Sequence, residues 1–274
     1  MAEVASVTLT PIPILLYHSV SDNPPASIRD FSVPAATFER HLDVVAQAGL
    51  TSVTVSQLCD GLTGRGPLPL RPVVLTFDDG WADFASAAVA VHERGLVATL
   101  YVTTGFLQGG GIAATTMGAL TTDALHWSQL ADLVDLGIEI GAHCHAHRQL
   151  DVVPLAVARD EIRRSRHLLE ETLQQPVRSF AYPHGFSSPA VRTLVVEEGY
   201  ESACAVKNAL SSSNDHVFEL ARLTVRPATT DDQLDTWLAG SGARLAPFPE
   251  RPLTRMWRGW RRARYQMTRR PHGP

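Results

Sequence analysis

The segment PVVLTFDDG, residues 72–80, joins a short apolar run to two carboxylates and a glycine. A run of this kind is typical of a buried strand. Asp78 and Asp79 follow it directly, and Gly80 allows the sharp turn that could bring both carboxylates toward one cavity. A turn with two solvated acids and no function would have the same sequence. A function at this strand end is therefore indicated only if other polar groups converge there.

Similar strands recur along the chain and alternate with helices. The expected strands cover residues 12–20, 51–55, 72–77, 97–104, 138–143, 177–183, 200–206 and 219–225. The main expected helices cover residues 35–50, 85–95, 124–137, 154–173 and 188–199. This alternation, without an internal repeat, predicts a parallel α/β fold. In such folds the chemistry lies at the carboxyl ends of the strands.

The charge of the chain is unevenly distributed. Its 274 residues suit a single large domain, and the formal net charge is −4. The segment from Glu250 onward carries eight arginines and one glutamate, so the rest of the chain is strongly acidic. An acidic body argues against nucleic-acid binding. We therefore expect a folded body at residues 1–248 and a separate Arg/Trp-rich amphipathic tail at residues 249–274.

The cysteines and the N-terminus bear on the compartment. Three scattered cysteines do not make a disulfide framework. The first residues lack the basic region and the cleavage site of a secretion signal, and no run reaches 18 apolar residues. The expectation is a cytoplasmic protein with reduced thiols.

Three histidines follow the expected strand at 138–143. His143 and His147 are four residues apart, which places their side chains on the same side of either a strand or a helix. His145 shares that face only if the strand continues. Catalytic zinc takes three protein ligands, and Asp79, His143 and His147 would supply them. A polar loop with incidental histidines is the alternative.

A third polar cluster, RSFAYPHG, begins at Arg178. An unpaired charge within a strand is costly, so Arg178 should have an acidic partner. Asp78 is the expected partner, because a guanidinium can hold a carboxylate in one orientation. A solvated position at the start of the strand would explain Arg178 equally well.

Together these clusters resemble the polysaccharide deacetylases, which are built on the NodB homology domain (carbohydrate esterase family 4). TFDDG is similar to the first motif of that family, the H-x-x-x-H from His143 to His147 to the second, and R-x-F-x-Y-P-x-G from Arg178 to Gly185 to the third. The start ILLYHSV resembles the branch that includes exopolysaccharide N-deacetylases. The resemblance covers roughly residues 12–226.

The resemblance implies an α/β fold, a distorted (β/α)7-type barrel, and a metal-dependent hydrolase that removes an N-acetyl group from a sugar. Asp79, His143 and His147 would bind one divalent metal ion. Zinc is expected, with cobalt, nickel and manganese as alternatives. His145 would not be a ligand.

The resemblance also assigns catalytic roles. Asp78 would be the general base and Arg178 its orienting partner, while the backbone N–H of Tyr182 would help to hold the oxyanion. The usual acid, a histidine in a Leu-x-His motif, is missing, because the matching segment is Leu223-Thr224-Val225. His184 and His18 are the candidate acids, and return of the proton by Asp78 is a third route.

The expected substrate is an N-acetylated sugar in a polysaccharide, a lipid-linked intermediate or a glycoconjugate. Trp81, Trp127 and the loop at 105–122 could form a sugar-stacking rim, although either tryptophan could instead pack in the core. The alternative functions are hydrolysis of a non-sugar amide or imide C–N bond and a carbohydrate-binding pseudoenzyme.

The tail predicts a basic amphipathic helix. Its apolar residues recur at helical spacing, and they are Leu253, Met256, Trp257, Trp260, Ala263 and Met267. Such a helix could bind the inner face of an anionic membrane, dock on a partner such as a glycosyltransferase, or pack on the acidic body.

Overall fold

The computed structural model describes residues 10–109, 124–249 and 252–268. In chain order the strands are β1 (Pro11–Ile12), β2 (Ile14–Tyr17), β3 (Ser19–Val20), β4 (Ser32–Val33), β5 (Thr51–Ser52), β6 (Pro72–Phe77), β7 (Ala98–Val102), β8 (Ile138–Ala142), β9 (Ser179–Ala181), β10 (Ser202–Cys204), β11 (Ala209–Ser212), β12 (Leu223–Thr224) and β13 (Arg244–Leu245). The helices are α1 (Ala35–Gln47), α2 (Val55–Leu62), α3 (Phe84–Glu93), α4 (Gln129–Asp135), α5 (Leu155–Leu173), α6 (Pro189–Glu197), α7 (Asp231–Leu238) and α8 (Pro252–Thr268), with short 3-10 helices η1 (Arg29–Phe31) and η3 (Pro183–Gly185).

Seven strands form one continuous path in the order β10-β9-β8-β7-β6-β2-β12, and every pairing along it is parallel. The two ends of the path approach each other, because Cys204 of β10 forms an isolated bridge with Leu220, just before β12. The N–H of Ala205 donates to the Leu220 carbonyl at 2.9 Å. The sheet is therefore curled, as the predicted distorted barrel requires.

Alternation along the strands sorts the buried side chains into two clusters, one inside the curled sheet and one between the sheet and the helices. The inner cluster includes Ile14, Val74, Tyr101, Ala181, Cys204 and Leu220. The outer cluster includes Leu15, Leu75, Leu100, Phe180, Tyr182 and Leu223. Helix α2 packs on the inner cluster through Val55 and Leu58, so it covers the amino-terminal end of the sheet.

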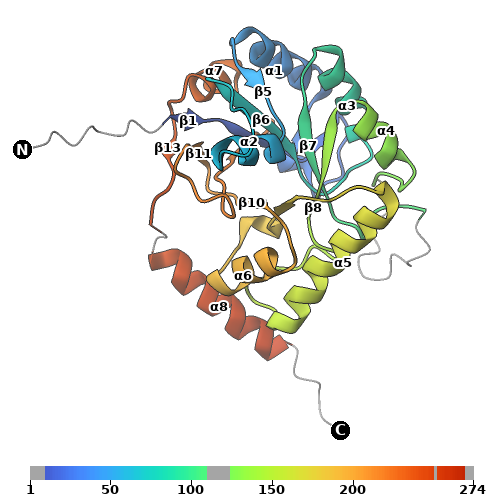
Figure 1. Cartoon of the computed structure of the whole chain (residues 1–274), viewed down its shortest axis with the longest axis vertical. Coiled ribbons are helices and arrows are strands. Elements are labelled where there is room, and N and C mark those ends of the chain that lie inside the picture. Colours follow the sequence, from blue (N-terminus) through green and yellow to red (C-terminus); the bar gives the residue numbers. More distant parts are fainter. Residues whose placement is uncertain (1–9, 110–123, 250–251, 269–274) are drawn as a thin grey trace, which may run out of the picture.

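The remaining helices surround the sheet, with α1, α3, α4 and α5 around its outer face and α8 alongside α6 (Figure 1). Helix α8 is attached by arginines. Arg261 donates two hydrogen bonds, at 2.9 and 2.6 Å, to the buried carboxylate of Asp151, and Arg258 lies 3.3 Å from the same carboxylate. A buried, paired carboxylate thus fixes the C-terminal helix to the body.

The predicted tail helix is present, but most of its described apolar side chains face away from the body. Met256, Trp257, Trp260 and Met267 are between 49% and 70% exposed, whereas Arg261 is only 8% exposed. The rings of Trp257 and Trp260 stack with their centroids 4.9 Å apart. Within the described parts of the chain, no helix combines the length and the apolar character needed to cross a membrane.

Candidate active site

Three strand ends meet at one cavity of about 440 Å³. Asp78 and Asp79 follow β6, His143 follows β8, and His184 follows β9. His147 joins them from the loop after β8. All five side chains line the cavity. The parallel sheet therefore brings together the polar clusters that the sequence places at its carboxyl ends.

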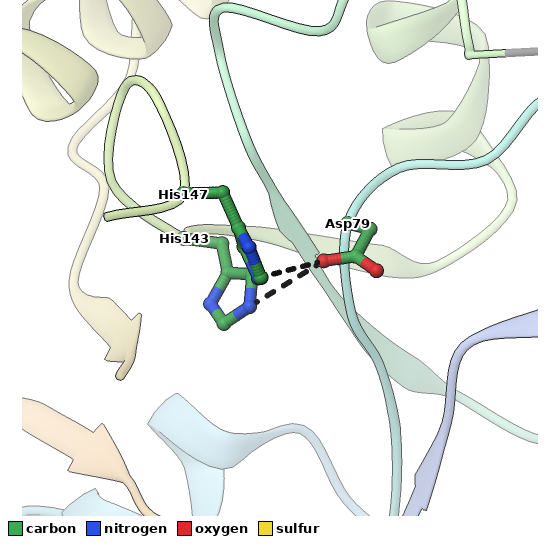
Figure 2. A group of neighbouring side chains, drawn as sticks. All are labelled: Asp79, His143 and His147. Carbon is green, nitrogen blue, oxygen red and sulfur yellow. Dashed lines mark ion pairs between the residues drawn. The ribbon is translucent and has the colours of Figure 1, made fainter. Parts of the chain in front are cut away.

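Asp79, His143 and His147 place three ligand atoms within 4.8 Å of one another (Figure 2). From Oδ1 of Asp79, Nε2 of His147 is 3.2 Å away and Nε2 of His143 is 3.6 Å away. That buried oxygen accepts no hydrogen bond from the residues described. Nδ1 of His143 donates to the Ala181 carbonyl at 2.8 Å, which leaves the lone pair on Nε2. Two imidazole nitrogens and a carboxylate oxygen fit a divalent ion such as zinc.

Unusual backbone conformations direct these side chains into the cavity. Asp79 has φ 77°, Gly80 has φ 84°, and His147 has φ 51°. The turn after β6 brings both Asp78 and Asp79 to the cavity, as the segment 72–80 predicts. A left-handed conformation costs a non-glycine residue about 1–2 kcal/mol. Its presence at two of the three converging residues indicates a functional constraint.

The charges of this triad depend on one another. Burial alone would raise the pKa of Asp79, but the adjacent His147 outweighs burial and holds that pKa well below its usual value. Burial alone would lower the pKa of His147, and the Asp79 carboxylate raises it instead. Burial lowers the pKa of His143 to about 4. Asp79 is thus ionised and His143 neutral near pH 7, which are the states that bind a cation.

Asp78 is held by Arg222, a residue that the sequence motifs do not single out. The guanidinium donates hydrogen bonds at 2.7 and 2.8 Å to the two carboxylate oxygens, and both side chains are buried. Burial alone would raise the pKa of Asp78, but Arg222 outweighs it and lowers that pKa. Arg222 lies two residues after Leu220, which belongs to the inner cluster, so both side chains point into the curled sheet. The alternation in the segment ELARLTV, residues 219–225, could therefore have indicated that Arg222 points inward.

The prediction that Arg178 orients Asp78 is wrong. Arg178 lies at the amino-terminal end of β9, where it donates to Asp60 at 2.6 Å and to Glu201 at 2.9 Å. The reason is the alternation of side chains along the strand. Arg178 lies two residues before Phe180 and therefore points to the same face, which is the outer one toward the helices. The expected acidic partner exists, but it lies at the opposite end of the strands from the cavity.

The prediction that the backbone of Tyr182 holds the oxyanion is also wrong. Its N–H donates to the Cys204 carbonyl at 3.1 Å, because pairing between β9 and β10 continues to this residue. Its hydroxyl donates to the Phe218 carbonyl at 2.9 Å. Two residues later, His184 has φ 58° and lines the cavity, so its N–H is a candidate donor in place of that of Tyr182.

Both candidate acids line the cavity. The ring of His184 is 4.6 Å from that of His147, and His18 packs on Phe31 with centroids 5.0 Å apart. Burial lowers the pKa of both histidines, that of His184 to about 4. Each imidazole is therefore neutral near pH 7 and would have to accept a proton before it could donate one.

The segment that should carry the usual acid supplies no imidazole. Thr224 lines the cavity, whereas Val225 is fully buried and donates its N–H to the Leu16 carbonyl at 2.9 Å. The structure therefore agrees with the sequence that this position cannot donate a proton.

The two tryptophans differ in position. Trp81 lines the cavity, and its Nε1 donates to Oδ2 of Asp79 at 3.2 Å, so it also orients that carboxylate. Trp127 packs against the outer cluster and does not line the cavity, so its predicted place on the rim is wrong. Phe106 of the predicted lid loop lines the cavity, while residues 110–122 lie outside the described residues.

The sequence and the fold were compared with those of known proteins, and the matches point to one family. The sequence pattern of the polysaccharide deacetylases matches residues 65–203, just over half of the chain. The YxkH protein of Bacillus subtilis (strain 168), whose name places it among the polysaccharide deacetylases, is 23% identical over 228 residues. That alignment covers 83% of this chain and 76% of YxkH.

Two solved structures share the fold. The deacetylase PplD of Streptococcus pyogenes, solved with acetate, has a TM-score of 0.73 and 22% identity, over 83% of this chain and 97% of PplD. IcaB from Ammonifex degensii has a TM-score of 0.69 and 22% identity, over 83% of this chain and 97% of IcaB. With the sequence match across β6 to β9 and the polar residues at their ends, these findings show that the chain belongs to the polysaccharide deacetylase family.

Proposed function

We propose that the protein is a metal-dependent N-deacetylase that hydrolyses the acetamide of an N-acetylated sugar and releases acetate. The family supports a hydrolase of acetylated sugars. The finer proposal rests on one observation. The Asp79–His143–His147 triad and the buried Asp78–Arg222 pair share one cavity.

Asp79, His143 and His147 would hold one divalent ion, with zinc preferred and cobalt, nickel or manganese as alternatives. When bound, such an ion lowers the pKa of water toward about 7 and polarises a carbonyl. Trp81 supports the ligand set by its hydrogen bond to Asp79. His143 is supported from the other side by the Ala181 carbonyl.

Asp78 is the proposed general base. Arg222 keeps its carboxylate ionised and fixes its orientation, and Oδ2 lies 3.7 Å from Nε2 of His143, next to the triad. Asp78 can therefore accept a proton from the attacking water. The N–H of His184 is the proposed oxyanion donor. Because His18 and His184 are neutral near pH 7, return of the proton from Asp78 is the simplest route to the leaving amine.

The decisive experiment measures acetate release from a panel of N-acetylated sugars by the metal-loaded protein and by an Asp78→Asn variant. We expect the variant to keep the metal and to lose activity about a thousand-fold. Acetate or ammonia from amides or imides, with none from sugars, would support the non-sugar alternative. The other alternative is a carbohydrate-binding pseudoenzyme, because a valine, Val225, stands where the usual acid would be. A pseudoenzyme would bind sugar without releasing acetate and would be unaffected by Asp78→Asn.

We further propose that α8 contacts the anionic inner face of a membrane. Exposed Trp257 and Trp260 offer an aromatic surface of the kind that inserts at a bilayer interface, and Arg262 and Arg264 are exposed on the same helix. Sedimentation with phosphatidylglycerol vesicles should capture the protein, and a W257A/W260A variant should bind at least several-fold less. Equal binding of both proteins would contradict the contact and leave a protein partner, such as a glycosyltransferase, as the alternative.

A further inference from the structure

The two histidines of the triad, His143 and His147, are joined by a short loop, residues 144–146 (Figure 2). Cys144 has φ 54° and His147 has φ 51°, so both lie in the left-handed region of backbone conformation. Conformations of this kind persist only where the surrounding structure fixes them. The loop between the two ligands therefore needs contacts from outside itself, and it has them on two sides.

The first side is the segment that follows β7, which binds carbonyl groups of the loop. The N–H of Thr104 donates to the Cys144 carbonyl at 3.2 Å, and the N–H of Gly105 donates to the His145 carbonyl at 2.8 Å. The approach is close enough that a Cβ added to Gly105 would lie 2.5 Å from the His145 oxygen. The N–H groups of the loop must be satisfied from another direction.

The second side is Glu161 of α5, which binds N–H groups of the loop. One carboxylate oxygen, Oε2, accepts from the N–H of His145 at 3.1 Å and from that of Ala146 at 2.6 Å. The other oxygen accepts from Nε of Arg148 at 2.8 Å. Because His145 and Ala146 lie between the two ligands in sequence, this carboxylate holds the middle of the loop.

The position of Glu161 on its helix is unusual for a charged residue. It is 6% exposed, and the other buried residues of α5 are Ala158, Ile162, Ser165 and Leu169. Packing of an amphipathic helix would favour an apolar side chain at such a position. A buried carboxylate is costly unless it is paired and hydrogen-bonded. The bonds to the loop therefore account for a carboxylate at this place.

We propose that Glu161 is a positioning residue for the metal centre and holds His147 in place by fixing the backbone between the two ligands. His147 depends most on this support, because it lies in the loop, whereas His143 directly follows β8 and donates its N–H to the Val102 carbonyl at 2.9 Å. This inference rests on the proposed function, since it takes the triad as the site of a divalent ion.

Zinc affinity, measured by competition with a chelating dye, tests the proposal. We expect Glu161→Ala to weaken zinc binding by about ten-fold or more, because both N–H groups lose their acceptor and His147 is released. Glu170→Ala on the same helix is the matched control, since Glu170 also accepts from a backbone N–H, that of Val177 at 3.1 Å, and from Arg166 at 2.9 Å. The control should bind zinc as the wild type does. Unchanged affinity in Glu161→Ala, or equal weakening in the control, would overturn the proposal.

Two conservative variants decide the matter even if the alanine variant does not fold. Glutamine keeps an oxygen at the same reach, so Glu161→Gln should bind zinc nearly as tightly as the wild type. Aspartate keeps the charge but is one methylene shorter, so Glu161→Asp should bind zinc at least several-fold more weakly than Glu161→Gln. The reverse order would show that Glu161 acts through its charge, and it would refute the positioning role.

Turnover separates this inference from the proposed function. Glu161 is not among the described residues that line the cavity, so at limiting zinc Glu161→Asp should lower kcat and change the KM for an N-acetylated sugar by less than about two-fold. Acetate release by the wild type, with unchanged zinc affinity in Glu161→Asp, would refute the positioning role alone. Weakened zinc binding in that variant, with no acetate from any N-acetylated sugar, would refute the deacetylase and leave the positioning role in place. A wild type that binds no divalent ion would refute both.

Discussion

Arg178 and Arg222 each directly precede a strand of the same curled sheet, and they lie in opposite surroundings. Arg222 points inward, is fully buried and reaches Asp78 at the carboxyl end of β6. Arg178 lies at the amino-terminal ends of the strands, is 31% exposed, and pairs with Asp60 and Glu201. The same residue type therefore holds a carboxylate of the cavity at one end and belongs to a partly exposed ion-pair network at the other.

The surroundings decide how much each pair matters. If either Asp78 or Arg222 is removed, the charge of the other stays buried with neither an ion-pair partner nor solvent to stabilise it. Around Arg178, solvent screens the charges, and Arg65 also contacts both Asp60 and Glu201, at 3.0 and 2.7 Å. Substitutions at the carboxyl end should therefore lower both turnover and the free energy of unfolding. Substitutions at the amino-terminal end should lower only the free energy of unfolding.

The largest effect is expected for His143→Ala. Loss of a ligand from the triad should remove the metal and lower acetate release by about a thousand-fold or more, since a bound ion supplies several kcal/mol of transition-state stabilisation. Metal content and turnover are measured on the same preparation. His145→Ala is the matched control, because His145 hydrogen-bonds Thr104 at 2.9 Å and stands outside the triad. Metal loss in the control would refute the ligand assignment.

The next effect is expected for Arg222→Met. It leaves Asp78 buried and unpaired, which should lower the free energy of unfolding in urea by about 3–5 kcal/mol. Turnover should fall as well, since the base loses its orientation. A double variant with Asp78→Asn should recover part of the stability and none of the turnover. If the single variant is as stable as wild type, the pair does not hold the strand ends together.

A smaller effect is expected for Arg178→Met at the amino-terminal end. The free energy of unfolding should fall by about 1 kcal/mol, because the lost ion pairs are partly exposed and Arg65 still contacts both acids. The ratio kcat/KM should change less than about two-fold. A large loss of turnover in a protein that is still folded would restore a catalytic role to Arg178.

The smallest effect concerns the pH dependence of stability. Hydrogen bonds from Arg178 lower the pKa of Asp60 and of Glu201 in the folded state. Their contribution is therefore complete above the unfolded pKa values, near 4, and is lost as pH falls through the lower folded values. Melting temperatures from pH 6 to pH 3 should drop more steeply for wild type than for Arg178→Met. Parallel curves would mean that these ion pairs contribute nothing.

The chain alone was sufficient for the seven strands of the parallel path, for the helices α1, α3, α4, α5 and α6 between them, and for the grouping of Asp79, His143 and His147. Apolar runs and their polar ends are local signals, and a parallel sheet must bring its carboxyl ends to one edge. Asp79, His143 and His147 could therefore be grouped across more than 60 positions. The excess charge of α8 could be recognised in the same way, but the side of the helix that faces the body could not.

The partner of Asp78 depended on the three-dimensional arrangement. Arg178 and Arg222 both precede apolar strands, and only the pairing of β12 beside β2 brings Arg222 inside the sheet to the end of β6. Pairing of β9 with β10 likewise decides the role of Tyr182, because its N–H donates to the Cys204 carbonyl. Residue types and spacing specify which groups are available. Strand parity and register decide which of them reach the cavity, because a shift of one position moves a side chain to the other face of the sheet.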